Sequence, residues 1–309
     1  MSTGALVAVL LTVISAATPL LLAALGELVV ERSGVLNLGV EGMMLAGAVV
    51  AFAVTVSTGS HTLGVVGGAL GGMALACIFA VLTLSLMANQ VATGLALTIF
   101  GIGLSALVGA SFVGIPVAPL PELDLPVLSD LPVLGPLLFS HDALIYLSIA
   151  LTVAVAWFLR RARAGLILRA VGENQDSAHA LGYPVIRIRY LAVLFGGLCA
   201  GLGGAFLSLS YTPMWAEGMT AGRGWIALAL VVFAAWRPWR VLLGAYLFGG
   251  VTILQLYAQS AGELGLPSQV FSMLPYLATI LVLTIISAGP WRARLNAPAC
   301  LGRPFHPAV

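Results

Sequence analysis

The chain has 309 residues, of which 61% are hydrophobic and only 8% are charged. Soluble domains carry roughly 25% charged residues, so this composition excludes a soluble globule, a disordered chain and a nucleic-acid-binding protein, and places most of the chain in membrane lipid. All 13 basic residues are arginine, which excludes a P-loop lysine and a Schiff-base lysine, so that any ATP used here is hydrolysed by another chain.

Nine apolar runs are candidates for membrane crossings, because a spanning helix needs about 20 apolar residues. They lie near residues 4–26, 35–56, 62–88, 91–114, 142–159, 190–211, 223–236, 241–259 and 272–288. We therefore expect an all-α polytopic membrane protein with about 8–10 transmembrane helices.

Two places in this series predict broken elements. The run between Arg223 and Arg237 has 13 residues, which make a helix of about 20 Å against a hydrocarbon core of about 30 Å. We expect it to pair with residues 211–222 as a broken or re-entrant element. The stretch 27–37 is interrupted as well. Broken helices at membrane depth usually line a cavity.

The arginines predict the orientation. The loop 160–189 holds six arginines against Glu173 and Asp176, a net charge of +4, which favours the cytoplasmic side. The transmembrane domain is expected to end near residue 290, and the tail 291–309 has three arginines and no acid, so the C-terminus is expected in the cytoplasm. The Pro-rich, acidic loop 115–141 is expected outside as an irregular connection. Counting back from an inner C-terminus through the nine candidate runs places the N-terminus outside.

A short capped helix is predicted inside the basic loop. Asn174 is a good N-cap and Asp176 supplies early negative charge, whereas Gly182 and Pro184 end the helix after about two turns. Such a helix is marginal alone in water. Either it packs on the protein's own inner surface, or it inserts into a groove on a cytoplasmic partner. Its small apolar surface consists of Ala178, Ala180 and Leu181.

Four stretches carry a resemblance to a known family. They are the run from Arg169 to Asn174 with Ala180-Leu181-Gly182, the segment ERSGVLNLGVEGMM at 31–44, NQVATGLAL at 89–97, and GRGWIALAL at 222–230 followed by WRPW at 236–239. From about residue 5 to 290 the chain resembles permease subunits of ATP-binding-cassette (ABC) importers, the family of simple-sugar, ribose and branched-chain amino acid permeases. It is most similar to the nucleoside-importing subgroup that works with basic-membrane-lipoprotein-type binding proteins.

This resemblance implies a transport subunit of the plasma or inner membrane that performs no covalent chemistry and needs no cofactor. A lipoprotein would deliver a nucleoside or related simple sugar to the outer face, and two permease subunits, paralogous or identical, would form the pathway. Cytoplasmic ATPases would drive transport through the helix in the basic loop, here called the coupling helix. The coupling residues implied are Gly172, Glu173, Asn174, Ala178, His179 and Gly182.

Candidate pathway residues are polar or aromatic groups near the helix breaks. Asn37 and Glu41 are four residues apart and form a polar ridge, which either lines the pathway or satisfies backbone groups at a break. Asn89 and Thr93 are helix caps or pathway groups at a predicted inner turn, and neutral amides suit a sugar or a base. Trp215 and Trp225 are either members of an interfacial aromatic belt or a stacking platform for a base.

Two other functions compete with this one. A proton-driven secondary transporter of a small polar solute would use Glu27 or Glu41 as its relay, but it leaves the capped helix unexplained. An intramembrane hydrolase is disfavoured because the sequence has neither HExxH nor GxSxG, and the four histidines are too scattered to predict a metal site.

Overall fold

The structure is a computed structural model that describes residues 3–124, 134–261, 273, 274, 277, 280, 281, 284 and 297–306. In these residues seven helices are long and apolar enough to cross a membrane. They are α1 (Thr3–Arg32), α2 (Val40–Thr58), α3 (His61–Ala80, continued by a π-helical turn at Val81–Ser85), α4 (Gln90–Gly109), α6 (Ala143–Arg161), α9 (Val185–Phe206) and α11 (Pro238–Ala261). The predicted all-α polytopic fold is confirmed. Most of the run 272–288 lies outside the described residues.

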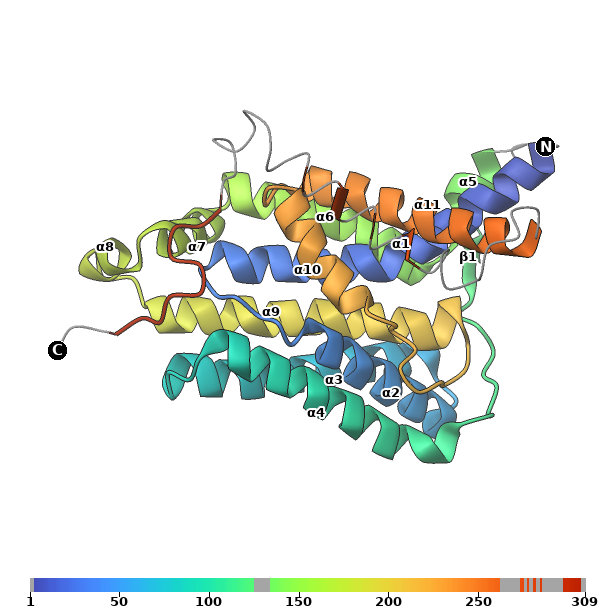
Figure 1. Ribbon diagram of the computed structural model, residues 1–309, viewed down its shortest axis with the longest axis horizontal. Helices are drawn as coiled ribbons and strands as arrows, with labels where there is room; N and C mark the ends of the chain where they lie inside the picture. The colour runs from blue at the N-terminus through green and yellow to red at the C-terminus, as the bar shows by residue number, and fades with distance from the viewer. Residues whose placement is uncertain are drawn as a thin grey trace.

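Shorter elements connect these helices. They are α5 (Leu134–Phe139), α7 (Arg163–Glu173), α8 (Gln175–Ala180), α10 (Arg223–Phe233), and the strands β1 (Glu122–Asp124) and β2 (Ser140–Asp142). Figure 1 shows α1 and α9 running beside each other along the long axis. The first residues of α1 lie near α5 and β1, and the tail 297–306 lies with α7 and α8 at the other end, which we call the basic end.

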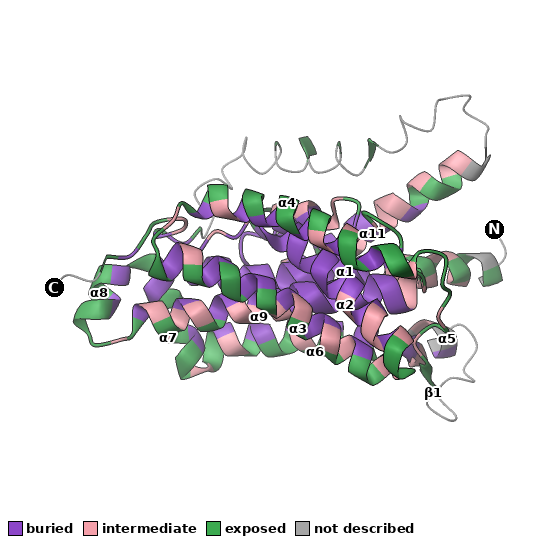
Figure 2. Ribbon diagram, turned by 90° about the horizontal axis from the view of Figure 1, so that it is seen from below, coloured by how far each residue is buried: buried purple, intermediate pink, exposed green. Residues whose placement is uncertain are grey.

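The core consists of α1, α2, α3 and α9, and in Figure 2 the purple of buried residues is densest around α1 and α2. Glycines on the facing sides of α3 and α9 let these two helices approach closely. A Cβ atom on Gly72 of α3 would lie 2.4 Å from the carbonyl oxygen of Gly197 in α9. The two backbones therefore touch, which is how helices associate in lipid without a hydrophobic driving force.

The outer helices present apolar side chains outward. Ile99 and Leu107 of α4 are 71% and 78% exposed, and Leu243 and Leu254 of α11 are 70% and 67% exposed. Such surfaces are stable in lipid or against another subunit. The chain is therefore a multi-pass membrane protein.

The loop 115–141 is more ordered than the sequence predicted. Glu122 pairs with Asp142, and Leu123 pairs with His141, in an antiparallel ladder between β1 and β2. The short helix α5 precedes β2. The expectation of an irregular connection was wrong for these residues. Backbone groups that are not in a helix need other hydrogen-bond partners, and here the two short strands provide them for each other. Residues 125–133 lie outside the described part.

At the basic end, α7 precedes the predicted capped helix. The side chain of Asn174 accepts a 2.9 Å hydrogen bond from the Ser177 amide, and Gly182 is left-handed with φ of 86°. Both predicted ends of α8 are thus confirmed. The helix α7 was not predicted from the sequence, although Leu168 and Val171 are spaced for one helical face and both are buried.

Candidate functional site

Two helices begin in the interior of the molecule. After α1 ends at Arg32, the connection 33–39 runs back toward the middle before α2 starts, as Figure 1 shows. The irregular segment 212–222 likewise returns from the end of α9 to the start of α10. The N-terminal ends of α2 and α10 therefore meet inside the bundle. The predicted broken element at 211–236 is an irregular, turn-rich segment followed by the short helix α10 (Arg223–Phe233).

Glu41, in the first turn of α2, joins the two helix starts. Its carboxylate accepts hydrogen bonds from the Thr220 hydroxyl at 2.5 Å, the Gly222 amide at 2.8 Å and the Gly224 amide at 2.6 Å. It is 5% exposed. The first amides of a helix lack intrahelical partners and carry partial positive charge, so an anionic acceptor stabilises them. Glu41 thereby fixes the start of α10 against α2.

Glycine is required where α10 meets Glu41. Gly222 has a left-handed φ of 81°, which residues with a Cβ atom adopt at a cost. A Cβ atom on Gly224 would lie 2.5 Å from the Cα atom of Glu41. The backbone can approach the carboxylate only because both positions lack side chains.

Asn37 supports the neighbouring break between α1 and α2. Its backbone and side-chain nitrogens lie 3.3 and 3.4 Å from the carboxylate oxygens of Glu27, and its side-chain oxygen accepts a 3.0 Å hydrogen bond from the Gly39 amide. For Asn37 and Glu41 the structure thus shows the second alternative, the satisfaction of backbone groups at helix breaks. A direct contact of either residue with a substrate stays a prediction.

The other predicted pathway residues are spread over the molecule. Asn89 caps α4 by accepting a 3.0 Å hydrogen bond from the Ala92 amide, and the nearby Thr93 is half-buried. Trp215 packs at the far end of α4, where a Cβ atom on Gly109 would collide with its indole. A helix of 20 residues separates these ends by about 30 Å, so the two groups do not line one site.

The two tryptophans differ in their surroundings. Trp215 is only 2% exposed in a buried cluster with Phe52 and Leu209, and its part in the pathway stays a prediction. Trp225 is half-buried, packs against the main core and follows Gly224 directly. Of the aromatic candidates, Trp225 therefore lies next to the junction at Glu41.

Two threonines at the junction were missed by the sequence analysis. Thr220 donates to Glu41, and Thr98 of α4 donates a 3.0 Å hydrogen bond to the carbonyl of Leu38. Thr220 lies in the stretch TAGRG before a short apolar run. A glycine-rich turn before a helix too short to span was the available signal for its role.

The six predicted coupling residues divide into buried and exposed groups. Gly172 is buried against the Arg32 carbonyl, and Ala178 is 3% exposed in a cluster with Val185 and Phe305. The exposed members are Glu173, Asn174, His179 and Gly182. Leu181 is 78% exposed. The helix α8 thus packs one face on its own chain and presents another face outward.

The tail holds α8 in place. Gln175 donates a 3.0 Å hydrogen bond to the carbonyl of Pro304, and the rings of His179 and Phe305 meet edge to face with centroids 5.3 Å apart. The Cys300 amide donates to the Gly172 carbonyl at 2.9 Å. The tail has no apolar periodicity that would have predicted this packing.

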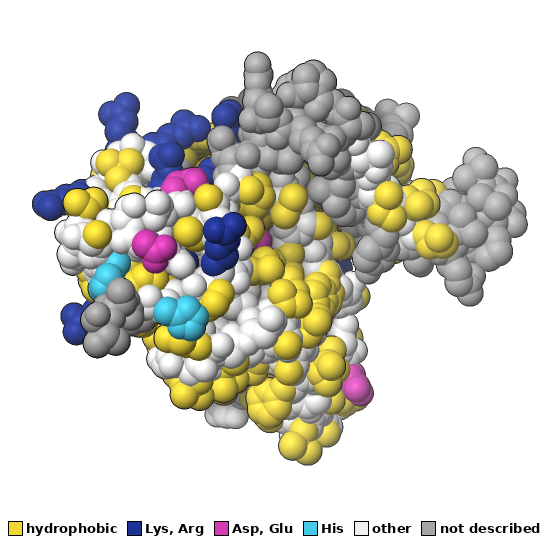
Figure 3. Space-filling view, turned by 60° about the vertical axis from the view of Figure 1, so that its left-hand side comes forward, with side chains coloured by type: hydrophobic (Ala, Val, Ile, Leu, Met, Phe, Trp, Pro, Cys, Tyr) yellow, Lys and Arg dark blue, Asp and Glu magenta, His cyan; other side chains and the backbone are white. Residues whose placement is uncertain are grey.

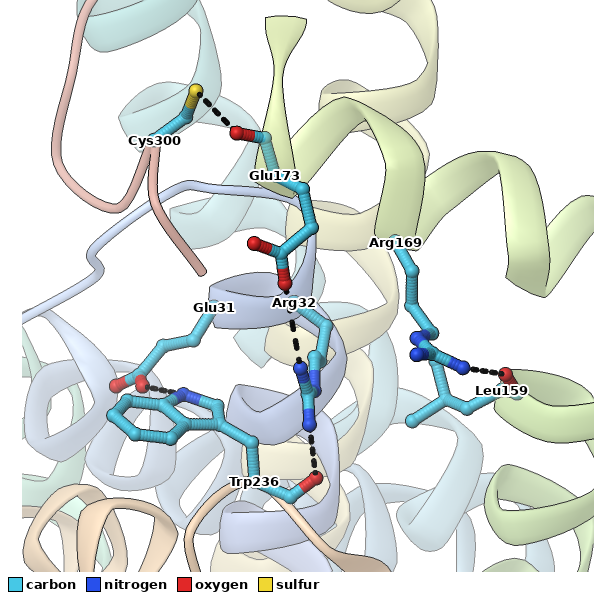
Figure 4. Close-up of polar contacts among 7 residues, drawn as sticks. All are labelled: Glu31, Arg32, Leu159, Arg169, Glu173, Trp236 and Cys300. Carbon is cyan, nitrogen blue, oxygen red and sulfur yellow. Dashed lines mark hydrogen bonds and ion pairs between the residues drawn. The ribbon is translucent and has the colours of Figure 1, made fainter. Parts of the chain in front are cut away.

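A second polar group lies where α1, α7 and the turn before α11 meet, as Figure 4 shows. The Trp236 indole donates a 2.5 Å hydrogen bond to Glu31, and Arg32 donates to the Trp236 carbonyl at 3.1 Å. Arg32 also lies 4.0 Å from the carboxylate of Glu173. These contacts tie the end of α7 to the end of α1.

Comparison with known proteins gives consistent results. The family described as "Branched-chain amino acid transport system / permease component" matches residues 9–283. A putative glucose ABC transporter permease protein of Haloferax volcanii, TsgC13, is 46% identical, with 93% of this chain and 94% of the relative covered. The guanosine ABC transporter permease protein NupQ of Bacillus subtilis is 32% identical, with 94% and 93% covered.

A third relative is the nucleoside ABC transporter permease protein NupC of Lactococcus lactis subsp. cremoris. It is 32% identical, with 87% of this chain and 88% of the relative covered. No solved structure matched the chain.

Proposed function

Because this chain belongs to the family of branched-chain amino acid transport system permease components, and is an ABC-type permease subunit rather than an enzyme, we propose that it forms the membrane pathway for a nucleoside or a simple sugar. The names of its relatives support both substrates. Glucose and guanosine share a ring with several hydroxyl groups, so a pathway lined by neutral hydrogen-bonding groups suits either one.

The junction at Glu41 is the observation that supports the proposed position of this pathway in the molecule. Two helices start inside the bundle, and their first amides converge on one carboxylate. In membrane transporters, irregular backbone at membrane depth is tolerated where it is buried in protein or lines a cavity. We infer that opening and closing of the pathway moves α10 relative to α2, with Asn37 and Trp225 near the moving parts.

An ABC permease works with an ATPase and with a substrate-binding protein, as its family implies. We propose that the ATPase docks on α8 through Leu181, His179 and Gly182, while Gly172 and Ala178 hold the helix on its own chain. This places the basic end and the tail in the cytoplasm. Ten arginines of the described residues lie in the elements of that end, which agrees with the positive-inside bias.

The remaining partners belong to the same proposal. A second permease subunit, either a paralogue or an identical copy, would cover part of the exposed apolar surface of the outer helices. A substrate-binding lipoprotein would dock at the end that carries β1 and β2. The assembly would lie in the cell membrane.

Uptake by cells that express the whole transporter tests the substrate. Labelled guanosine and labelled glucose should be offered separately, each with an excess of the other unlabelled. We expect uptake of one of them to require an intact ATPase. Uptake that persists with a hydrolysis-dead ATPase and collapses with a proton uncoupler would instead support the proton-driven alternative.

Cross-linking tests the docking surface. A photo-crosslinking residue in place of Leu181 should capture the ATPase. The matched control is the same residue in place of Leu123, which is 49% exposed on β1 at the opposite end. Capture from Leu123 and not from Leu181 would contradict the proposed orientation.

A further inference from the structure

A polar cavity of about 270 Å³ opens at the basic end, separate from the Glu41 junction. It lies between the ends of α1 and α6, one side of α7, and the turn that joins α10 to α11. Four of its lining residues are arginines, and each comes from a different one of these elements. They are Arg32, Arg160, Arg169 and Arg237.

Arg32 is the most deeply placed of the four. It is 7% exposed, donates to the Trp236 carbonyl at 3.1 Å, and is close enough to Arg169 and Arg237 to be repelled by both. Figure 4 shows the guanidinium groups of Arg32 and Arg169 near each other, with Arg169 donating to the Leu159 carbonyl at 3.3 Å. Like charges are thus gathered around one space.

The turn that closes the cavity is strained. Ala235 and Trp236 are consecutive non-glycine residues with left-handed φ angles of 49° and 54°. Such conformations persist only where surrounding contacts enforce them, and they cluster at functional sites. Here the contacts are those of Trp236 with Arg32 and Glu31.

The carboxylates nearby do not balance the arginines. Glu31 accepts from the Trp236 indole, and Glu173, whose side chain is 53% exposed, lies 4.0 Å from Arg32 at the edge of the group. Within the described residues, Arg160 and Arg237 form no ion pair. Among the described residues in and beside the cavity, four guanidinium groups face two carboxylates, an excess of positive charge that an anion would neutralise.

The cavity also lies where three candidate membrane spans end, which is the depth at which lipid headgroups are expected. The spans Leu6–Arg32, Ala143–Arg161 and Pro238–Gln259 all reach one of their ends there. Figure 3, which brings this end of the molecule forward, shows arginine side chains gathered on it. An anion could therefore arrive from the headgroup layer as well as from solution.

We propose that this cavity binds a phosphate group, carried either by an anionic phospholipid or by a soluble phosphate compound. The guanidinium group matches phosphate through two parallel hydrogen bonds, and arginines from four elements around one cavity can contact a tetrahedral anion from several sides. A bound phosphate would connect α1, α6, α7 and the turn before α11, and α7 leads directly into the coupling helix. The general enrichment of arginine on the cytoplasmic side of membrane proteins does not by itself place four arginines around one cavity. Arg161 and Arg187 lie at the same end of the molecule and do not line it.

Binding to the purified full chain in neutral detergent tests the proposal without reference to transport. The probes are dioctanoyl phosphatidylglycerol, dioctanoyl phosphatidylcholine and inorganic phosphate, each titrated while the melting temperature is followed. The wild type should be stabilised by phosphatidylglycerol or by inorganic phosphate at concentrations where phosphatidylcholine has no effect. Stabilisation by phosphatidylglycerol alone identifies a lipid ligand, and stabilisation by both identifies a site open to soluble phosphate.

The double variant Arg169→Gln/Arg237→Gln should bind the active probe at least tenfold more weakly, because charge-assisted hydrogen bonds are lost. The matched control is Arg161→Gln/Arg187→Gln, which removes the same charge from exposed positions at the same end. If the first double variant does not fold, Arg237→Gln alone serves, since Arg237 is exposed on the turn. Equal weakening in the control, or no preference of the wild type over phosphatidylcholine, would overturn the proposal.

Discussion

Arg189 of α9 donates a 2.7 Å hydrogen bond to the side-chain oxygen of Gln175, the first residue of α8. The same guanidinium donates to the carbonyls of Ser33 at 3.1 Å and Arg303 at 3.2 Å. Arg189 is 1% exposed. One buried side chain thus connects the coupling helix, a spanning helix, the tail and the break between α1 and α2. A displacement of α8 would reach that break through this contact.

Substitutions at Gln175 should therefore reduce the local stability of α8 to different degrees. Gln175→Leu removes the acceptor for Arg189 and the donor to Pro304, and we expect a loss of about 2 kcal/mol in local stability, typical of a hydrogen bond to a charged group. Gln175→Glu keeps an acceptor for Arg189 but loses the donor to Pro304. Amide hydrogen exchange in α8 should accelerate most in Gln175→Leu and less in Gln175→Glu. Equal protection in both variants and the wild type would show that the contact does not hold the helix.

Glu41 should be essential to the packing of α10. Glu41→Ala leaves the Thr220 hydroxyl and two amides buried without their acceptor, at a cost on the order of 3 kcal/mol. Glu41→Gln should cost less but still reduce stability, because its amide NH₂ must face one of the donors. The melting temperature in detergent and the substrate uptake should both be highest in the wild type, lower in Glu41→Gln and lowest in Glu41→Ala.

The control for this series is Glu217→Gln, at an exposed position in the segment before α10. It makes the same chemical change without touching the junction, so both melting temperature and uptake should stay at the wild-type level. A wild-type melting temperature in Glu41→Ala would contradict the structural role assigned to the carboxylate.

The glycine contact between α3 and α9 predicts opposite effects for two substitutions. Gly72→Ala would place its methyl group 2.4 Å from the Gly197 carbonyl oxygen, and separating two packed backbones should cost about 1–3 kcal/mol. Gly103→Ala on α4 meets nothing within 4 Å and should leave the melting temperature unchanged or raise it. Thermal unfolding of the isolated chain in detergent compares them. Equal losses would indicate that helix flexibility, and not close packing, requires the glycines.

Leu181 should affect coupling without affecting folding. Because it is 78% exposed, Leu181→Asp should leave the melting temperature of the isolated chain near the wild-type value. Uptake should fall strongly, since a charge would enter the proposed apolar contact with the ATPase. Leu181→Met keeps an apolar side chain of similar volume and should retain most of the uptake. Normal uptake by Leu181→Asp would remove this residue from the docking surface.

Local signals in the sequence were sufficient for several elements. The caps of α8 followed from Asn174 and Gly182, whose effects depend on neighbouring backbone groups alone. The short run before Arg237 predicted the half-helix α10, because its length is too small for the bilayer. In contrast, the helix α7 and the strand pair in the loop 115–141 were missed.

Contacts between distant segments could not be predicted from the sequence. Nothing near Glu41 in the sequence indicates that its carboxylate accepts from residues about 180 positions later, and the tail gives no periodic signal of its packing on α8. Composition and apolar run length determined that the chain is a helical membrane protein, because lipid requires every backbone group to be satisfied within the spanning segment. Which side chains close the breaks, hold α8 and gather the arginines was decided only by tertiary packing, because those partners are brought together by the arrangement of whole helices.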